Sequence, residues 1–285
     1  MNNDRIQEIL DLMEEARLDY FLISDPQSIA YCTGYYNDPH ERMFVFMISK
    51  HGNHTLFMND LFYLDHDLDV NIVWHKDGQD AIQTIVDEMH FPGRIGIDKN
   101  WASHFLLDLM KKLPDAKYIN ASPCVDLVRM KKDLQEQVLM IESSKINDAV
   151  MEEIIPFIQE GVTEKQLAKK LDELFFKHHS TCYGAIVAFG KNAADPHHEN
   201  DDTLLRKGDC VLIDMGCVYK GYCSDMTRTF FYEGILEEEI KVYEIVKKAN
   251  EAAEAMIKPG VKLSDIDKCA RKVISDEGYG KYFTH

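Results

Sequence analysis

Two aspartates with ten residues between them, Asp214 and Asp225, are the residues of this sequence best placed to do chemistry together. Asp214 follows an apolar run typical of a buried strand, and Tyr219-Lys220-Gly221 is typical of a turn. A hairpin with Tyr219 and Lys220 as its two-residue loop would place the two aspartates directly opposite each other. A longer loop with a bulge at Gly221 would shift the pairing by one residue and still leave them close.

Two carboxylates that face each other across a sheet repel, so a mostly apolar setting requires a proton or a cation between them. Oxygen ligands suit hard divalent ions such as Mn²⁺ or Mg²⁺, and they also hold Zn²⁺ or Co²⁺. A metal site is therefore one interpretation of the spacing of Asp214 and Asp225. Two unrelated surface aspartates at the ends of a hairpin are the other.

A double histidine, His197-His198, lies in a loop before the aspartate strand. A single histidine in a sequence is more often structural than catalytic, but a pair next to two candidate ligands is a better candidate for chemistry. Cys217 and Cys223 fall within the same hairpin. They lack the CxxC spacing of a metal knuckle, so we expect them to pack rather than to bind metal.

Composition narrows the class of protein. The 285 residues suggest two domains of medium size. A net charge of −17 argues against nucleic acid as a partner and disfavours an anionic membrane surface. The seven cysteines are scattered, the N-terminal residues do not resemble a secretory signal, and no apolar run has membrane-spanning length. We therefore expect a cytoplasmic protein with reduced thiols and no membrane partner.

Hydrophobic periodicity predicts an α/β (α+β) chain with one domain over residues 1–125 and a second over 130–285. In the first domain, Ile6, Ile9 and Met13 indicate one face of a helix. Apolar runs between turn signals predict its strands at 20–23, 44–48, 55–58 and 94–98.

The second domain opens with helices. Asp133 with Glu136 and Thr163 with Gln166 are capping boxes, and Pro156 ends the first of the two helices that they begin. Strands are predicted at 183–189, 210–213 and 227–232, followed by a helix over about 237–256. A last helix is expected to be capped by Ser264 and to end at Gly278.

The second domain also contains an internal echo. Ile158-Gln-Glu-Gly161-Val162 and Ile257-Lys-Pro-Gly260-Val261 each lie between a helix and a capped helix. A duplicated half-domain would explain the likeness, and chance similarity is the alternative. If the duplication is real, the second copy has too few residues left to supply its strands.

The aspartate hairpin resembles the signature of the pita-bread metallopeptidases, the family of methionine aminopeptidase, prolidase, aminopeptidase P and creatinase. The matching residues are Asp214-x-Gly216 and Tyr222-x-Ser224-Asp225-x-Thr227-Arg228-Thr229. Three earlier segments resemble the N-terminal domain and linker of the prolidase branch, namely Ile29-Ala-Tyr31-Cys-Thr33-Gly34-Tyr35, Arg94-Ile-Gly-Ile-Asp98 and Arg129-Met-Lys-Lys132. The resemblance covers nearly the whole chain and implies a creatinase/prolidase-like domain followed by a pita-bread catalytic domain.

The resemblance implies two divalent metal ions, Mn²⁺ above all and Co²⁺ or Zn²⁺ as alternatives, held by two aspartates, one histidine and two glutamates. Asp214 and Asp225 match the two aspartates, and His197 matches a substrate-binding histidine. His285 matches a second, substrate-side histidine in a segment that begins Tyr282-Phe283-Thr284. The histidine ligand and both glutamates have no counterpart in this sequence. The pita-bread domain is therefore expected to be incomplete, with open sheet edges, weak metal binding and no activity of its own.

The activity implied for the parent enzyme is hydrolysis of Xaa-Pro bonds, as a dipeptidase or an aminopeptidase, on peptides with proline in second position. A creatinase-like C–N hydrolase is an alternative that the intact aspartate pair disfavours. A non-catalytic scaffold on the same fold is another, and such relatives usually lose their ligands. The family also implies a homodimer, which a monomeric mass in solution would contradict.

Overall fold

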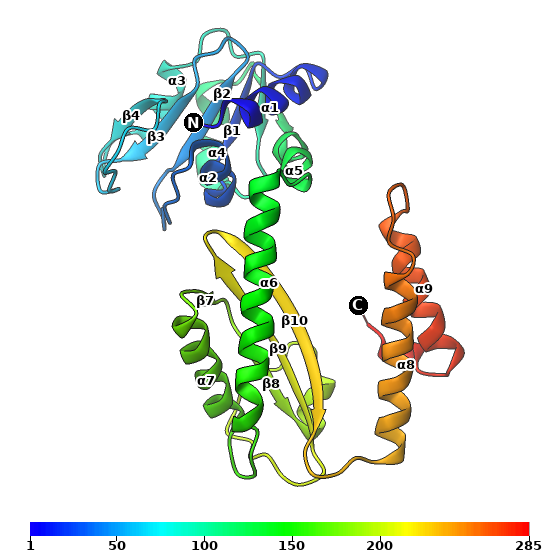
Figure 1. The fold of residues 1–285 in the computed structure, drawn as a ribbon. Coiled ribbons are helices and arrows are strands. Elements are labelled where there is room, and N and C mark those ends of the chain that lie inside the picture. The colour runs from blue at the N-terminus through cyan, green and yellow to red at the C-terminus, as the bar shows by residue number, and fades with distance from the viewer. Residues whose placement is uncertain (285) are drawn as a thin grey trace. The chain divides into compact units, whose positions relative to one another are not determined.

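The chain folds into two compact units, residues 1–132 and 133–285, and the computed structural model describes residues 1–284 (Figure 1). Both units combine helices with strands, which confirms the predicted α/β class. Among the described residues, no helix is both long enough and apolar enough to cross a membrane.

The first unit is built on a six-stranded mixed sheet in the order β4-β3-β2-β1-β5-β6. The strands are β1 (Tyr20–Ile23), β2 (Val45–Ser49), β3 (Thr55–Asn59), β4 (Asn71–His75), β5 (Arg94–Ile97) and β6 (Lys117–Asn120). Strand β2 pairs antiparallel with β1 and β3, whereas β5 runs parallel to β1 and β6. The four predicted strands are present within one residue, but β4 and β6 were not predicted because polar residues interrupt them.

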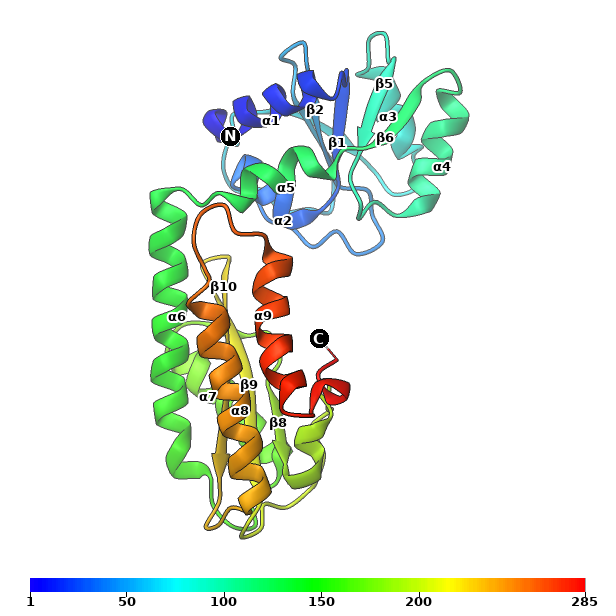
Figure 2. The same ribbon diagram turned by 90° about the vertical axis from the view of Figure 1, so that its right-hand side faces the viewer.

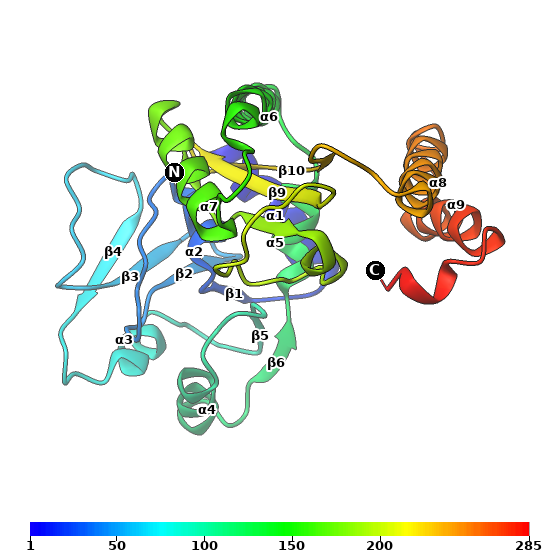
Figure 3. The ribbon, with the colours of Figure 1, turned by 90° about the horizontal axis from the view of Figure 1, so that it is seen from below.

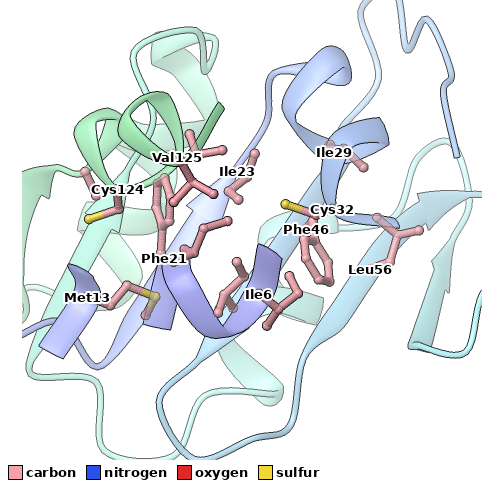
Figure 4. Packing of buried hydrophobic residues seen from close by; sticks show 14 of the residues in the cluster. Ile6, Met13, Phe21, Ile23, Ile29, Cys32, Phe46, Leu56, Cys124 and Val125 are labelled. Carbon is pink, nitrogen blue, oxygen red and sulfur yellow. The ribbon is translucent and has the colours of Figure 1, made fainter. Parts of the chain in front are cut away.

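Helices cover both faces of this sheet, which explains why its central strands are apolar on both sides. The helices are α1 (Asn3–Glu15), α2 (Pro26–Thr33), α3 (Ala81–Asp87), α4 (Ser103–Lys112) and α5 (Ser122–Met130). Figure 4 shows Phe21 and Phe46 of the sheet among Ile6 of α1, Ile29 of α2 and Val125 of α5. Burial of each such side chain contributes about 1.5–3 kcal/mol to stability.

Over its described residues, 133–284, the second unit combines a four-stranded antiparallel sheet with four helices (Figure 2). Its strands are β7 (Thr181–Cys182), β8 (Ile186–Phe189), β9 (Cys210–Tyr219) and β10 (Tyr222–Phe231). Its helices are α6 (Leu134–Ile154), α7 (Glu164–Lys177), α8 (Glu237–Glu254) and α9 (Leu263–Asp276), with 3₁₀ turns at Ile155–Phe157, Gly190–Ala194 and Gly280–Tyr282. Strand β9 is central and pairs with β10, β7 and β8.

The two faces of β9 have different partners. Val211, Ile213, Met215 and Cys217 point into a core that α6 and α7 help to form. Because side chains alternate along a strand, Asp214 and Gly216 lie on the opposite face. The helices thus cover one side of the sheet and leave the aspartate side for other contacts.

The predicted capping boxes are confirmed. The Asp133 carboxylate accepts a hydrogen bond from Glu136 N at 2.8 Å, and the Glu136 carboxylate accepts one from Asp133 N at 2.9 Å. Thr163 and Gln166 make the same exchange at the start of α7. Each box satisfies N–H groups that the first turn of a helix leaves without an internal partner.

The predictions of one helix cap and one strand were wrong. Ser264 does not cap the last helix, because α9 already begins at Leu263 with Lys262 in the capping position. The strand predicted over 183–189 covers only Ile186–Phe189 (β8), because Gly184 has a φ of +116° and separates β7 from β8. The predicted end of the last helix is correct, since Gly278 has a φ of +88° just beyond α9.

The β9–β10 hairpin forms with a loop displaced by one residue from the prediction. Tyr219 pairs with Tyr222, so Lys220 and Gly221 are the two loop residues. Both have positive φ, 49° and 85°, as a type I′ turn requires. The prediction placed Tyr219 in the loop, but glycine is better suited than tyrosine to the left-handed region.

The internal echo is present in three dimensions as two helical hairpins, α6–α7 and α8–α9. Gly260 follows Gly161 by 99 residues (260 − 161), and the bounds of α9 follow those of α7 by the same interval. Backbone hydrogen bonds repeat at this interval as well: Val162 N to Gln159 O matches Val261 N to Lys258 O, and Ser180 N to Phe175 O matches Tyr279 N to Ile274 O. Shared bonds of this kind favour duplication over chance.

Helices α8 and α9 lie side by side (Figure 3) and pack through Ile245, Ala249 and Ile274. Helix α8 also exposes Leu236 at its start, Ile240 and Val246. Strand β10 is paired on one side only within the described part of the chain. Strand β10 therefore forms one edge of the sheet, and α8 has apolar side chains at the surface.

The two loop residues of the β9–β10 hairpin should respond oppositely to substitution. Gly221→Ala is expected to lower the free energy of unfolding by about 1–2 kcal/mol, because an L-residue is disfavoured at that φ. Lys220→Asn is expected to raise it by about 0.5 kcal/mol, because asparagine tolerates the left-handed region. Urea unfolding followed by circular dichroism measures both. Equal effects of the same sign would contradict the type I′ turn.

Candidate active site

Asp214 and Asp225 lie on the same face of the β9–β10 hairpin as diagonal neighbours. Asp214 pairs with Thr227, and Asp225 pairs with Gly216, so the two aspartates are not directly opposed as predicted. Diagonal neighbours of this kind have Cα atoms about 7–8 Å apart, against about 4.5–5.5 Å for opposed pairs. The wider separation reduces their repulsion and leaves more room between the carboxylates.

Thr227 orients the first aspartate. Its hydroxyl donates a 2.8 Å hydrogen bond to Oδ1 of Asp214, directly across the two strands. A hydroxyl in this position fixes the rotation of the carboxylate and leaves the other oxygen available. This is how groups around a metal centre commonly orient the ligands.

Tyr183 explains why glycine stands between the aspartates in sequence. The Tyr183 hydroxyl donates a 2.8 Å hydrogen bond to the carbonyl oxygen of Ser224. A Cβ at position 216 would overlap both the Tyr183 hydroxyl and that carbonyl oxygen, which only Gly216 avoids. The phenol therefore lies over Gly216 of β9 and reaches the Ser224 carbonyl of β10, next to Asp225 in sequence.

The charges at this face act on Tyr183. Burial, followed by the negative charge of Asp225 and of other neighbours that include Asp214, raises the pKa of Tyr183 to about 12. The phenol is therefore fully protonated near neutral pH and acts as a hydrogen-bond donor.

The rear of the hairpin is held to α6 by buried polar contacts. Ser143 donates to the hydroxyl of Ser224 at 2.9 Å, and Cys217 lies 3.4 Å from the same hydroxyl. At the start of α6, Glu136 accepts a 2.8 Å hydrogen bond from the hydroxyl of Tyr222. These directional contacts fix the position of the aspartate strands on the helix. Cys217 packs as predicted, whereas Cys223 is exposed, so the same prediction was wrong for Cys223.

His197 lies in a loop beside β8. The backbone N–H of His197 donates to Oδ1 of Asp195 at 3.0 Å. The His197 side chain is exposed. Three residues on, Asn200 accepts from Val187 N and donates to Ala185 O, both at 2.7 Å. The Asn200 amide therefore replaces a neighbouring strand along the outer edge of β8. Strand β8 in turn pairs with the segment of β9 that contains Asp214.

The same loop is anchored from inside by Glu164. Its Oε1 accepts from Phe189 N and Asn192 Nδ2, and its Oε2 accepts from His198 Nε2 at 2.7 Å and from Asp201 N at 3.0 Å. Ligand atoms of Glu164, His198 and Asp201 lie within 4.8 Å of one another, close enough to share a metal ion. The four hydrogen-bond donors already directed at Glu164 favour a structural anchor over a metal site there.

The structure thus brings Asp214 and Asp225 onto one face and places the His197 loop beside the strand next to them. His285 lies outside the described residues. Sequence reasoning missed Tyr183, Glu164 and Asn200. A tyrosine at the first position of a predicted strand and a glutamate inside a capping box gave no signal of their own, because their partners are distant in sequence.

Comparisons with known proteins define the class. Residues 138–285 match the model of metallopeptidase family M24, and residues 5–131 match the creatinase/prolidase N-terminal domain. An uncharacterized peptidase of Staphylococcus aureus is 30% identical over 99% of this chain and 81% of its own length. The chain therefore belongs to metallopeptidase family M24, whose members use divalent metals.

Solved structures agree in fold. A dipeptidase from Pyrococcus horikoshii is 34% identical with a TM-score of 0.88, over 99% of this chain and 80% of that one. A prolidase from Thermococcus sibiricus is 29% identical with a TM-score of 0.91, over 100% and 80%. An Xaa-Pro dipeptidase from Bacillus anthracis is 26% identical with a TM-score of 0.87, over 99% and 79%. The fold predicted from the family resemblance is confirmed.

Gly216→Ala is expected to destabilise the second unit by about 1–3 kcal/mol, because the added methyl group has no space. Tyr183→Ala should restore only part of this loss in the double variant, since the Ser224 carbonyl oxygen also blocks the position. Urea unfolding of the single and double variants measures the coupling. Full restoration would mean that Tyr183 alone excludes a side chain.

Proposed function

We propose that this protein contributes to a two-metal peptidase site that hydrolyses Xaa-Pro bonds, with Asp214 and Asp225 as metal ligands. The observation that supports the proposal best is the shared face of the two aspartates, within a chain that matches metallopeptidase family M24. The named activities of the similar structures support the substrate class, since they are a dipeptidase, a prolidase and an Xaa-Pro dipeptidase.

The residues present suit divalent cations. Asp214 and Asp225 offer hard oxygen ligands of the kind that Mn²⁺ prefers, at a diagonal spacing that avoids direct contact between the carboxylates. The metal ions, when bound, would supply a water of lowered pKa and polarise the scissile carbonyl. We propose Mn²⁺ as the physiological ion.

The surrounding side chains have separate roles in this proposal. Thr227 holds the Asp214 carboxylate in one rotation, and Tyr183 donates to the Ser224 carbonyl and keeps the strand next to Asp225 in place. His197 is the proposed substrate-side histidine, because its loop runs along the strand next to Asp214 and leaves the imidazole exposed. Of the two peptidase activities, we favour the dipeptidase, which is the activity named for two of the three structures above.

Metal binding tests the ligand assignment. We expect the purified chain to bind Mn²⁺, and Asp214→Asn and Asp225→Asn each to weaken this binding at least tenfold, because each removes a charged oxygen ligand. Two carboxylates alone bind weakly, so titration calorimetry should extend to millimolar Mn²⁺. Asp202→Asn is the matched control, since Asp202 is exposed and pairs with Lys165. Equal binding by all four proteins would overturn the assignment.

Hydrolysis of dipeptides, measured on the same samples, tests the reaction. The ligands that the sequence lacks predict little activity for the chain alone, so any Ala-Pro hydrolysis should scale with the amount of Mn²⁺ bound per chain and exceed Ala-Ala hydrolysis at least tenfold. Samples stripped with EDTA should be inactive. Hydrolysis that persists without metal, or metal-dependent hydrolysis with no preference for proline, would contradict the proposed function.

A further inference from the structure

We propose that Glu164 is a positioning residue which, through His198, holds His197 in its place beside the aspartate face. The inference rests on the proposed function, because that function assigns His197 a role in substrate binding. It concerns a side chain on a different element from either aspartate, at the first residue of α7.

Glu164 is built as an anchor for a distant loop. Its side chain is 0% exposed, and four donors converge on its two oxygens. Phe189 N belongs to the end of β8, Asn192 to the 3₁₀ turn that follows, and His198 and Asp201 to the loop beyond. One carboxylate therefore connects the start of a helix to three successive parts of a later segment.

The charge of Glu164 is compensated where it stands. A buried carboxylate is costly unless hydrogen bonds replace its water. Glu164 receives two backbone N–H groups, an amide and an imidazole, and it lies at the positive end of the α7 dipole. A carboxylate only accepts hydrogen bonds, so Nε2 of His198 must carry the proton that it donates.

His198 transmits this anchoring to its neighbour. The His198 side chain is 13% exposed and points inward to Glu164, whereas the adjacent His197 is exposed. Asp195 on one side and Asn200 on the other fix the backbone around the two histidines. With His198 held inside, His197 is the one of these two histidines that the loop exposes to solvent. Without the hydrogen bond from His198 to Glu164, either imidazole could turn inward or outward.

The test separates loop order from metal binding. Glu164→Gln keeps the size of the side chain but directs an amide N–H₂ at existing donors. His198→Phe keeps a ring and removes the donated bond, whereas His198→Gln can restore a donor. Glu199→Gln is the matched control, because it removes one negative charge from an exposed position in the same loop.

Hydrogen exchange of residues 195–203 and the NMR signal of the His197 ring are measured on the full chain without metal or substrate. We expect exchange at least tenfold faster and a shifted His197 signal in Glu164→Gln and His198→Phe. Exchange should return toward the original rate in His198→Gln and remain unchanged in Glu199→Gln. Unchanged exchange and an unchanged His197 signal in both Glu164→Gln and His198→Phe would overturn the inference. If Glu164→Gln does not fold, His198→Phe and His198→Gln decide it.

Addition of Ala-Pro in a buffer that contains Zn²⁺, a diamagnetic ion, then tests whether the position of His197 affects substrate binding. We expect Ala-Pro to shift the His197 signal of the original chain, with an apparent Kd at least tenfold higher in Glu164→Gln and Mn²⁺ binding unchanged. Equal apparent Kd values for Ala-Pro in the original chain and in Glu164→Gln would overturn the positioning role of Glu164 alone. No shift in the original chain would overturn the substrate role of His197, and with it this inference, while leaving the metal-ligand assignment to its own experiment.

Discussion

The antiparallel pairing of β9 with β10 is the constraint on which the second unit depends. Each strand has one face against α6 and α7 and one face that contains aspartates. A slip of one residue in one strand would turn its aspartate toward the core and its apolar residues outward. The two-residue turn at Lys220 and Gly221 prevents this slip at one end, and the polar contacts of Ser143 and Glu136 prevent it along the strands.

The shared face of Asp214 and Asp225 could be predicted from sequence even though the register could not. Movement of the loop from Tyr219-Lys220 to Lys220-Gly221 changes the partner of every residue by two positions. Side chains alternate with a period of two, so the face of each aspartate is unchanged while direct opposition becomes a diagonal. Strands β1, β2, β3 and β5 were predictable for a related reason, because burial on both faces makes them continuously apolar.

The surroundings of the site were not predictable, because they depend on contacts between residues distant in the chain. Glu164 stands in a sequence that reads as an exposed first turn, yet it is buried by groups that follow it by 25 to 37 residues. Tyr183 meets the carbonyl of Ser224, 41 residues later. Strands β4 and β6 have polar residues among their apolar ones and are recognisable only beside β3 and β5. Composition gave no indication either, because in a chain with a net charge of −17 carboxylates are expected at the surface.

The repeated helical hairpin creates a problem of self-recognition during folding. Helix α9 follows α7 by 99 residues (263 − 164) and has the same length and the same turn before it, so each could in principle occupy the other's place. Their inward side chains differ in volume. Helix α7 presents Leu167, Leu171, Leu174 and Phe175, whereas α9 presents Ile266, Ala270, Val273 and Ile274 at the equivalent positions. The smaller set would leave cavities against α6, and the larger set would overfill the space beside α8. Unequal packing of the two hairpins thus disfavours exchange of one for the other, within one molecule or between two.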